Sequence, residues 1–225
     1  MIATDLGGPS KHNSLFVIGA GGHAKSIAEV AIAAGFTIKA FVSPVAEESE
    51  FMGIPVLKSL PDNIAVRTES IAIGIGANYL REKVMLELQE YCQPSRFPAL
   101  IHPSAIIASS AQISYGTTIH QNAVVGPSSR IGKFCTVNTS ATIDHDCVMN
   151  DFSSMGPGAH TGGGVIIGKR AHISIGAIAI HGIGIGSDSI LGAGSCATDS
   201  IHELTVAVGT PARALKQRLI NDPYL

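Results

Sequence analysis

The sequence predicts a small α/β domain followed by a solenoid of short β-strands, and three observations predict it. Near the start, an apolar strand passes through a glycine turn into an Ala-rich helix, an order typical of parallel sheets. From Ile101 onward an aliphatic residue recurs at every sixth position, a period that neither a helix nor a single strand produces. The chain of 225 residues is 45% hydrophobic but only 5% aromatic, so it can bury a core but has few large rings to fill one. We expect a tail at 1–13, the α/β domain at 14–98, the solenoid at 99–210 and a short C-terminal helix at 211–225.

Three apolar segments predict the elements of the α/β domain. Residues 15–18 form the first strand, and the Ala-rich stretch after the turn forms a helix that ends near Gly35. A second strand is expected at 38–42. A third apolar run begins at Ser70 and passes through glycines into an amphipathic helix at about 78–91. Such strand and helix alternation indicates a small parallel sheet, and hence a Rossmann-like domain.

The glycine turn of this domain has the sequence Gly19-x-Gly21-x-x-Ala24, whose backbone N–H groups can face a pyrophosphate. An NAD enzyme carries an acidic residue after its second strand to bind the ribose. This chain has Ser43-Pro44 there instead, which disfavours NAD. His23 in the turn either hydrogen-bonds a phosphate or sugar, or caps the helix.

The six-residue period covers seventeen positions, of which twelve hold Ile, Val or Leu. They are Ile101, Ile107, Ile113, Ile119, Val125, Ile131, Val137, Ile143, Met149, Met155, Thr161, Ile167, Ile173, Ala179, Ile185, Leu191 and Ala197. Short strands joined by tight corners, with one inward aliphatic side chain on each side, explain the period. Five of these residues precede a glycine, where we expect the corner to need unusual dihedral angles: Gly126, Gly132, Gly168, Gly186 and Gly192. After the solenoid, residues 211–220 are typical of a helix with Pro near its start, which would cap the last coil.

The composition excludes several classes of function. Fifteen Lys and Arg against seventeen Asp and Glu give a net charge of −2, without the basic field that nucleic acid or anionic lipid requires. No apolar run reaches the roughly 18 residues of a membrane span, and the opening residues lack the layout of a secretion signal. We therefore expect a cytoplasmic protein with neither a nucleic-acid nor a membrane partner. Four cysteines at long, irregular spacings suit neither a disulfide framework nor a zinc site, and we expect buried, reduced thiols: Cys92, Cys135, Cys147 and Cys196.

Hydrophilic residues gather in one coil of the predicted solenoid, around Asp144, His145 and Asp146. They follow the inward Ile143, so their side chains are expected to point outward. An imidazole flanked by carboxylates is suited to act as a general base, because the acid fixes its tautomer and stabilises the imidazolium. The alternative is a solvated surface histidine between two acids.

Three motifs, in chain order, resemble the hexapeptide-repeat sugar acetyltransferases, the family of the sialic acid O-acetyltransferases and the UDP-4-amino-sugar (bacillosamine-type) N-acetyltransferases. They are the turn Gly19-Ala-Gly-Gly-His-Ala24, the stretch Ile143-Asp-His-Asp-Cys147 preceded by Val137-Asn-Thr139, and the closing Val208-Gly-Thr-Pro-Ala-Arg213. The resemblance implies a left-handed parallel β-helix of triangular section with three hexapeptides in each coil. It also implies a homotrimer whose active sites lie between subunits.

The resemblance further implies a role for each matching residue. His145 would take the proton from the attacking amine, Asp146 would orient its ring, and Asn138 would lie near the acceptor amine. Two groups of small residues would let backbone atoms approach the pantetheine arm of acetyl-CoA: Gly162 and Gly163, then Gly192, Ala193 and Gly194. The phosphates of a nucleotide-linked sugar would be bound by the turn of Gly19, Gly21, Gly22 and His23.

The resemblance favours N-acetylation of a nucleotide-linked 4-amino-4,6-dideoxy sugar, by direct transfer from acetyl-CoA without a metal, in bacterial surface-glycan (lipopolysaccharide) biosynthesis. Three alternatives stay open: acetylation of a sugar hydroxyl, a metal-dependent hydrase on the same β-helix, and a non-catalytic solenoid that only binds a nucleotide sugar. A hydrase needs three converging histidines, and the sequence places no such set among His145, His172 and His181. We interpret His160, His172 and His181 as solvated or stacking polar residues.

Overall fold

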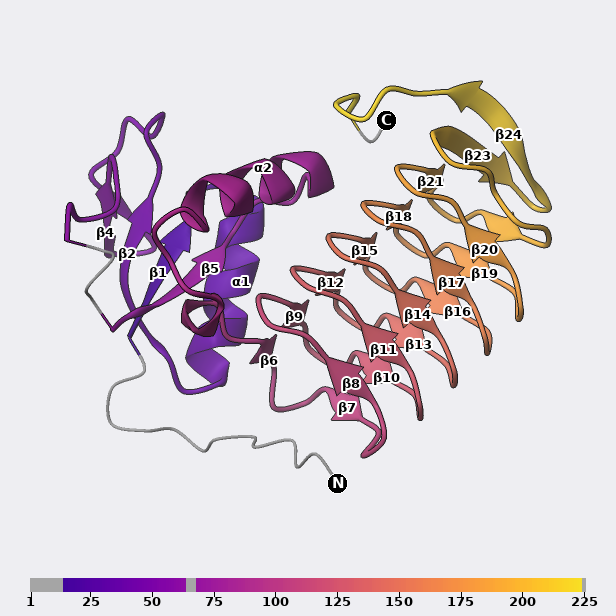
Figure 1. Cartoon of the computed structure of the whole chain (residues 1–225), viewed down its shortest axis with the longest axis horizontal. Helices are drawn as coiled ribbons and strands as arrows, with labels where there is room; N and C mark the ends of the chain where they lie inside the picture. Colours follow the sequence, from indigo (N-terminus) through magenta and orange to yellow (C-terminus); the bar gives the residue numbers. More distant parts are fainter. Residues whose placement is uncertain (1–13, 64–67, 224–225) are drawn as a thin grey trace.

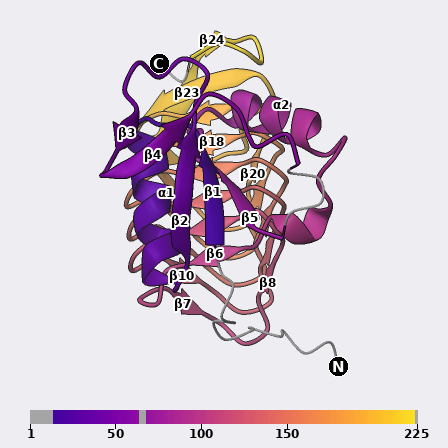
Figure 2. The same ribbon diagram turned by 90° about the vertical axis from the view of Figure 1, so that its left-hand side faces the viewer.

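The computed structural model describes residues 14–63 and 68–223, and the tail expected at 1–13 lies outside the described residues. An α/β domain is followed by a parallel β-solenoid, which confirms the predicted fold class apart from its C-terminal helix (Figure 1). Seen from the α/β end, the sheet of the first domain lies in front of the solenoid (Figure 2).

The first domain contains a five-stranded sheet in the order β3-β4-β2-β1-β5, in which β1 is parallel to both β2 and β5. Its elements are β1 (Ser14–Ile18), α1 (Gly22–Ala33), β2 (Thr37–Val42), β3 (Glu50–Phe51), β4 (Ile54–Leu57), β5 (Ser70–Ile73) and α2 (Asn78–Leu88), followed by a 3₁₀ turn (Pro94–Arg96). Apolar side chains of β1 and β2, among them Leu15 and Phe41, pack against Ile27 of α1 in one core. The three predicted strands and two helices are present, and the β3–β4 hairpin was not expected.

The solenoid consists of seventeen two-residue strands, β6 to β22, arranged as three parallel faces. The docked face, which faces the first domain, contains β6 (Leu100–Ile101), β9 (Thr118–Ile119), β12 (Thr136–Val137), β15 (Ser154–Met155), β18 (His172–Ile173) and β21 (Ile190–Leu191). The open face contains β7 (Ile106–Ile107), β10 (Val124–Val125), β13 (Thr142–Ile143), β16 (His160–Thr161), β19 (Ile178–Ala179) and β22 (Cys196–Ala197). The third face contains β8 (Gln112–Ile113), β11 (Arg130–Ile131), β14 (Val148–Met149), β17 (Ile166–Ile167) and β20 (Gly184–Ile185).

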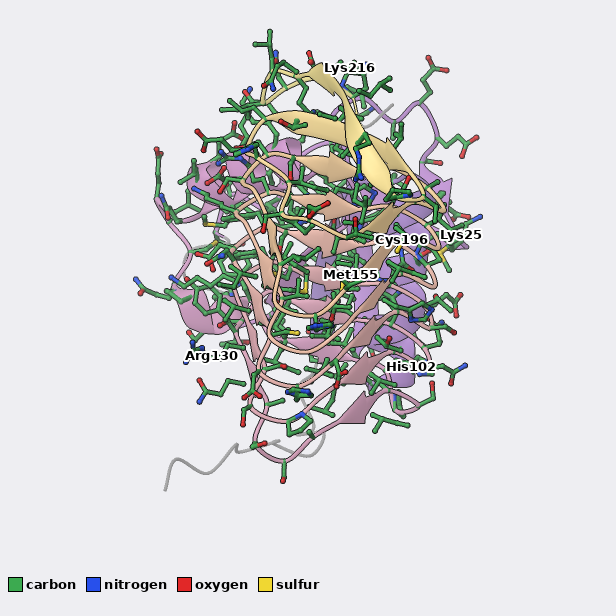
Figure 3. The ribbon with its side chains drawn as sticks, turned by 90° about the vertical axis from the view of Figure 1, so that its right-hand side faces the viewer. Lys25, His102, Arg130, Met155, Cys196 and Lys216 are labelled. Carbon is green, nitrogen blue, oxygen red and sulfur yellow. The ribbon has the colours of Figure 1, made fainter. Side chains whose placement is uncertain are left out.

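Each strand places its second residue inside the solenoid, which is the side chain that the six-residue period predicted. Strands of successive coils pair in register, for example Val125 with Ile143. Ile143 and Met155 are among the residues of the resulting core and are at most 1% exposed. Figure 3, viewed from the side of the C-terminal hairpin, shows Met155 inside the coils and Arg130 projecting outward.

The corners differ from the sequence expectation in how they use glycine. Positive φ angles occur at a later corner position, such as Asp146 with φ 58°, and not at the five glycines that follow an aliphatic residue. Glycine is required at those five positions because the next coil lies close to them. A Cβ on Gly126 would lie 2.7 Å from the backbone carbon of Asp144, and one on Gly168 would lie 2.4 Å from the nitrogen of Ser187. Stacked coils approach too closely for a side chain there.

The predicted C-terminal helix is wrong, because the chain forms a β-hairpin there. Strand β23 (Thr205–Gly209) adds in parallel to β21, and β24 (Ala212–Gln217) pairs antiparallel with β23. Without β23, the last coil would leave backbone N–H and C=O groups of β21 unpaired along its edge, and a strand satisfies them where a helix cannot. This tertiary pairing outweighs the helix propensity of the segment. The hairpin still covers the end of the solenoid (Figure 1).

Candidate functional site

His145 sits at the corner after β13, and its imidazole is held by the neighbouring Asp146. The Nδ1 atom of His145 lies 2.7 Å from Oδ2 of Asp146, and the backbone N–H of His145 donates to Oδ1 of Asp144 over 2.7 Å. The His145 and Asp146 side chains are 58% and 66% exposed. The pair is therefore ordered by local contacts and accessible to a ligand.

The charges around His145 favour its protonated form. The hydrogen bond to Asp146, and next the charge of Asp144, raise the pKa of the imidazole above its ordinary value. Because Nδ1 is engaged by the carboxylate, Nε2 is the nitrogen that can accept a proton from a ligand. This arrangement meets the geometric requirements of a general base.

The next coil supports the imidazole through a glycine. A Cβ on Gly163 would lie 2.4 Å from both Cε1 and Nε2 of His145, so no side chain fits beneath the ring. A Cβ on Gly162 would lie 2.7 Å from the backbone nitrogen of His181. Both glycines thus lie beside His145, along what we call the His145 edge, the line of corners between the open face and the third face.

Asn138 lies on a different line of corners, between the docked face and the open face, which we call the Asn138 edge. Its Oδ1 accepts the backbone N–H of Thr139 over 2.7 Å. Strand β13 of the open face separates Asn138 from His145 along the chain. Gly192, Ala193 and Gly194 follow β21 on the Asn138 edge, whereas Gly162 and Gly163 are on the His145 edge. Within one chain, the predicted catalytic and acetyl-CoA-binding residues therefore lie on two different edges of the solenoid.

A cavity of about 790 Å³ opens between the two domains. Its lining comes from His23 of α1, the start of α2, the docked face around Thr136 and Ser154, Asn138, and the C-terminal residues 220–223. Of the predicted site residues, His23 and Asn138 line it, and His145 and Asp146 do not. Burial, followed by the charge of Arg81, lowers the pKa of His23 to about 3, so its imidazole is neutral at pH 7.

The predicted phosphate-binding turn lies beside this cavity. Gly19 has φ 107°, and a Cβ on it would lie 2.9 Å from the carbonyl oxygen of Gly74, so this position requires glycine. Gly21 and Gly22 face open space and begin helix α1 without a side-chain cap. The turn therefore leaves the helix N-terminus accessible to an anion.

Sequence reasoning missed Arg81, which joins the two domains. Only 2% of it is exposed, and its guanidinium donates to the carbonyl oxygens of Ile75 and Gly76 and to Oδ1 of Asn78 in its own domain. It also donates to the solenoid, at Phe134 O over 2.8 Å and Phe152 O over 2.9 Å. On an amphipathic helix an Arg usually indicates a solvent-facing position, so the sequence carries no signal for this contact.

Of the other histidines weighed for a metal or stacking role, His181 lies on the His145 edge at the corner after β19, whereas His160 and His172 lie on two different faces. His172 is on the docked face with Nδ1 2.7 Å from Ser154 Oγ, and His160 is on the open face with Nδ1 2.7 Å from Thr142 Oγ1. Within 14–63 and 68–223, no group of three His, Cys, Asp or Glu side chains is placed to hold a metal ion. The four cysteines are free, and Cys196 is only partly buried.

Comparisons with known proteins match both domains. A family model described as the PglD N-terminal domain matches residues 14–88. A variant of GDP-perosamine N-acetyltransferase from Caulobacter crescentus, solved with CoA and GDP-perosamine, is 30% identical with a TM-score of 0.86, over 91% of this chain and 98% of that chain. The acetyltransferase domain of PglB from Neisseria gonorrhoeae, solved with acetyl coenzyme A, is 32% identical with a TM-score of 0.85, over 91% of this chain and 100% of that chain. This chain belongs to the hexapeptide-repeat sugar N-acetyltransferases.

Membership of this family makes the protein an acyltransferase and confirms the resemblance drawn from the three motifs. WeeI from Acinetobacter baumannii is a further structural match, 26% identical with a TM-score of 0.80, over 89% of this chain and 99% of that chain. None of the curated proteins matches the chain. Among the described residues of this acetyltransferase, no helix has the length and apolar character needed to cross a bilayer.

Proposed function

We propose that the protein transfers the acetyl group of acetyl-CoA to the amino group of a nucleotide-linked 4-amino-4,6-dideoxy sugar in bacterial surface-glycan biosynthesis. The observation that carries the proposal is the His145–Asp146 pair, 2.7 Å apart and packed over Gly163. It is supported by relatives solved with GDP-perosamine and with CoA or acetyl coenzyme A.

In the proposed reaction the neutral amine of the sugar attacks the thioester carbonyl carbon. A C–N bond forms, the carbonyl oxygen becomes an oxyanion, and Nε2 of His145 takes a proton from the nitrogen. Asp146 stabilises the imidazolium through Nδ1. The intermediate then collapses, the C–S bond breaks, and the CoA thiolate leaves and takes up the proton held on Nε2 of His145, which regenerates the base. No covalent enzyme intermediate and no metal enter this sequence.

We assign acetyl-CoA to the His145 edge because Gly164, the last of the glycines beside the base, faces open space, with Gly182 Cα 4.0 Å from where a Cβ would lie. Gly162, Gly163 and Gly164 follow one another there, and Gly164 has φ 69°, a conformation that other residues rarely adopt. The pantetheine arm would lie along these backbones. Gly192, Ala193 and Gly194 offer a second small-residue segment on the Asn138 edge.

The division of the site between two edges supports a homotrimer. We propose that the His145 edge of one protomer meets the Asn138 edge and the cavity of its neighbour, which would complete each site. The open face between these edges presents apolar side chains, with Ile106 64% and Ile178 43% exposed. Covering them with another copy removes apolar surface from water.

A thiol-release assay tests the proposed reaction. We expect CoA release from acetyl-CoA with a GDP- or UDP-linked 4-amino-4,6-dideoxy sugar, and mass spectrometry to place the acetyl group on nitrogen. The His145→Ala variant should lower kcat at least about 100-fold, the contribution of a general base. His202→Ala, which removes an exposed histidine elsewhere on the solenoid, should leave kcat unchanged.

Two results would contradict this proposal. Acetyl transfer to a hydroxyl, with no reaction of the amino sugar, would favour a sugar O-acetyltransferase. Nucleotide-sugar binding without any thiol release would favour the non-catalytic solenoid.

A further inference from the structure

Within residues 14–63 and 68–223, two side chains that line the cavity between the domains each have a buried nitrogen atom without a hydrogen-bond partner. These atoms are Nε2 of His23 and Nε of Arg218. Buried polar atoms in folded proteins are nearly always bonded, so an exception calls for a partner from outside the chain. His23 lies toward β9, with its ring centroid 6.3 Å from that of His120, and Arg218 lies toward β21, where it binds Asp188. The two orphan nitrogens therefore mark both ends of one cavity.

Arg218 also fixes the C-terminal segment, residues 218–223, as a wall of this cavity. Only 6% of Arg218 is exposed, and its Nη1 and Nη2 donate to Asp188 O over 2.6 Å and to Asp222 O over 2.5 Å. The carboxylate of Asp222 in turn accepts the backbone N–H of Leu219 over 2.7 Å. Residues Ile220 to Pro223 then line the cavity in succession. The guanidinium is held on one side by the protein, and Nε is left for a ligand.

The chemistry of this cavity favours an anionic ligand with oxygen acceptors. A guanidinium only donates, and it pairs best with phosphate or carboxylate oxygens. The first turn of α2, residues 78–80, lines the same cavity and has no side-chain cap. The positive end of the helix dipole attracts negative charge as well. Arg170, another lining cation, is already bound by Glu82 and Asp188, which leaves Arg218 to meet the ligand.

We propose that Arg218 donates from Nε to a phosphate oxygen of the acceptor nucleotide sugar, and that the C-terminal segment determines which acceptors fit. This inference rests on the proposed function, because it takes the nucleotide sugar as the ligand of the cavity. It assigns a binding role to Arg218 and a specificity role to residues 220–223, in addition to the glycine turn of the first domain.

The contact can be measured by calorimetry without catalysis. The probes are GDP and UDP. Whichever of the two binds more tightly is then compared with its nucleoside, guanosine or uridine. Arg218→Met should weaken binding of the nucleoside diphosphate at least about tenfold, as expected for a lost hydrogen bond to a charged group. Binding of the nucleoside should stay within about twofold. Arg213→Met, which alters an exposed arginine of β24, is the matched control and should leave both affinities unchanged.

A second variant tests the wall if Arg218→Met fails to fold. Ile220 is 41% exposed and lines the cavity, so Ile220→Trp adds bulk there while Arg218 keeps its contacts. It should raise the KM for the nucleotide sugar at least about tenfold and leave the KM for acetyl-CoA unchanged.

Two results would overturn the inference. The first is that Arg218→Met weakens nucleoside and nucleoside diphosphate binding equally, or weakens neither. The second is that Ile220→Trp leaves the KM for the nucleotide sugar unchanged. If either occurs while His145→Ala still lowers kcat at least about 100-fold, the inference fails and the proposed reaction stands. Phosphate-dependent binding through Arg218 without any thiol release would support the inference and contradict the proposed reaction.

Discussion

His145 is positioned by contacts that lie within a few residues of it or one coil away. Asp146 binds its Nδ1, the carboxylate of Asp144 accepts its backbone N–H, and Gly163 leaves room for its ring. The sequence motif contained both acids, so the pair could be predicted from the spacing. The need for glycine at 163 follows from coil stacking, which places residues 18 positions apart against each other.

The pKa of His145 leads to a prediction about pH dependence. A general base works when unprotonated, so kcat/KM should fall as pH drops through the raised pKa of His145. The Asp146→Asn variant removes the largest cause of that shift, lowers the pKa, and should move the acidic limb of the profile to lower pH. It should also lower kcat at least about tenfold, since the imidazolium loses its stabilising charge.

Measured pH–rate profiles of both proteins check this expectation. Asp199→Asn, which changes an exposed acid near the C-terminal hairpin, serves as the control and should leave the profile in place. If the acidic limb of the pH–rate profile lies at the same pH in Asp146→Asn as in the wild type, a group other than His145 is responsible for it.

Helix α2 is the element that joins the first domain to the solenoid. Asn78 at its start donates to Arg170 O and Ala171 O, over 2.9 and 3.1 Å, and Glu82 pairs with Lys169 and Arg170. Arg81 spans the same junction with donors to both domains. These bonds fix the cavity walls, which belong to separate parts of the chain.

We expect Arg81→Lys to loosen this junction although the charge is kept. Lysine has three donors on one atom and cannot reproduce the fork that reaches Phe134, Phe152 and Asn78. The free energy of unfolding should fall by about 3 kcal/mol, because buried acceptors lose their donors. Urea denaturation measures this loss.

Lys83→Met supplies the comparison, since Lys83 is an exposed cation on the same helix. If the free energy of unfolding changes only slightly, and by a similar amount in Arg81→Lys and Lys83→Met, the Arg81 contacts contribute little to stability.

The C-terminal hairpin shows how an element depends on its surroundings. Residues 212–217 have a helix-compatible sequence, yet five of the six are exposed and their backbone pairs with β23. An open strand at the end of the solenoid is a tertiary feature, so local sequence could not reveal it.

For the whole molecule, the apolar open face leads to a prediction about assembly. Ile178→Asp places a charge where we expect a neighbouring protomer, and burial of that charge is costly. We expect sedimentation velocity to show trimers for the wild type and monomers for the variant. Thiol release should be lost with the trimer, because each site would need two protomers.

The control for assembly is Ile32→Asp on α1. Ile32 is 47% exposed, similar to Ile178, but lies outside the solenoid. Both variants remaining trimeric, or a fully active monomer, would remove the intersubunit site from the proposal.

The repeat, the order of the domains and the His145 motif could all be read from local patterns. An inward side chain every six residues is a property of the backbone period, and a base with an adjacent acid needs only neighbouring residues. The cavity, the separation of Asn138 from His145, and the roles of Arg81 and Arg218 depend on contacts between residues far apart in the chain. Such contacts are set by how coils stack and domains dock, and a one-dimensional pattern does not contain those distances.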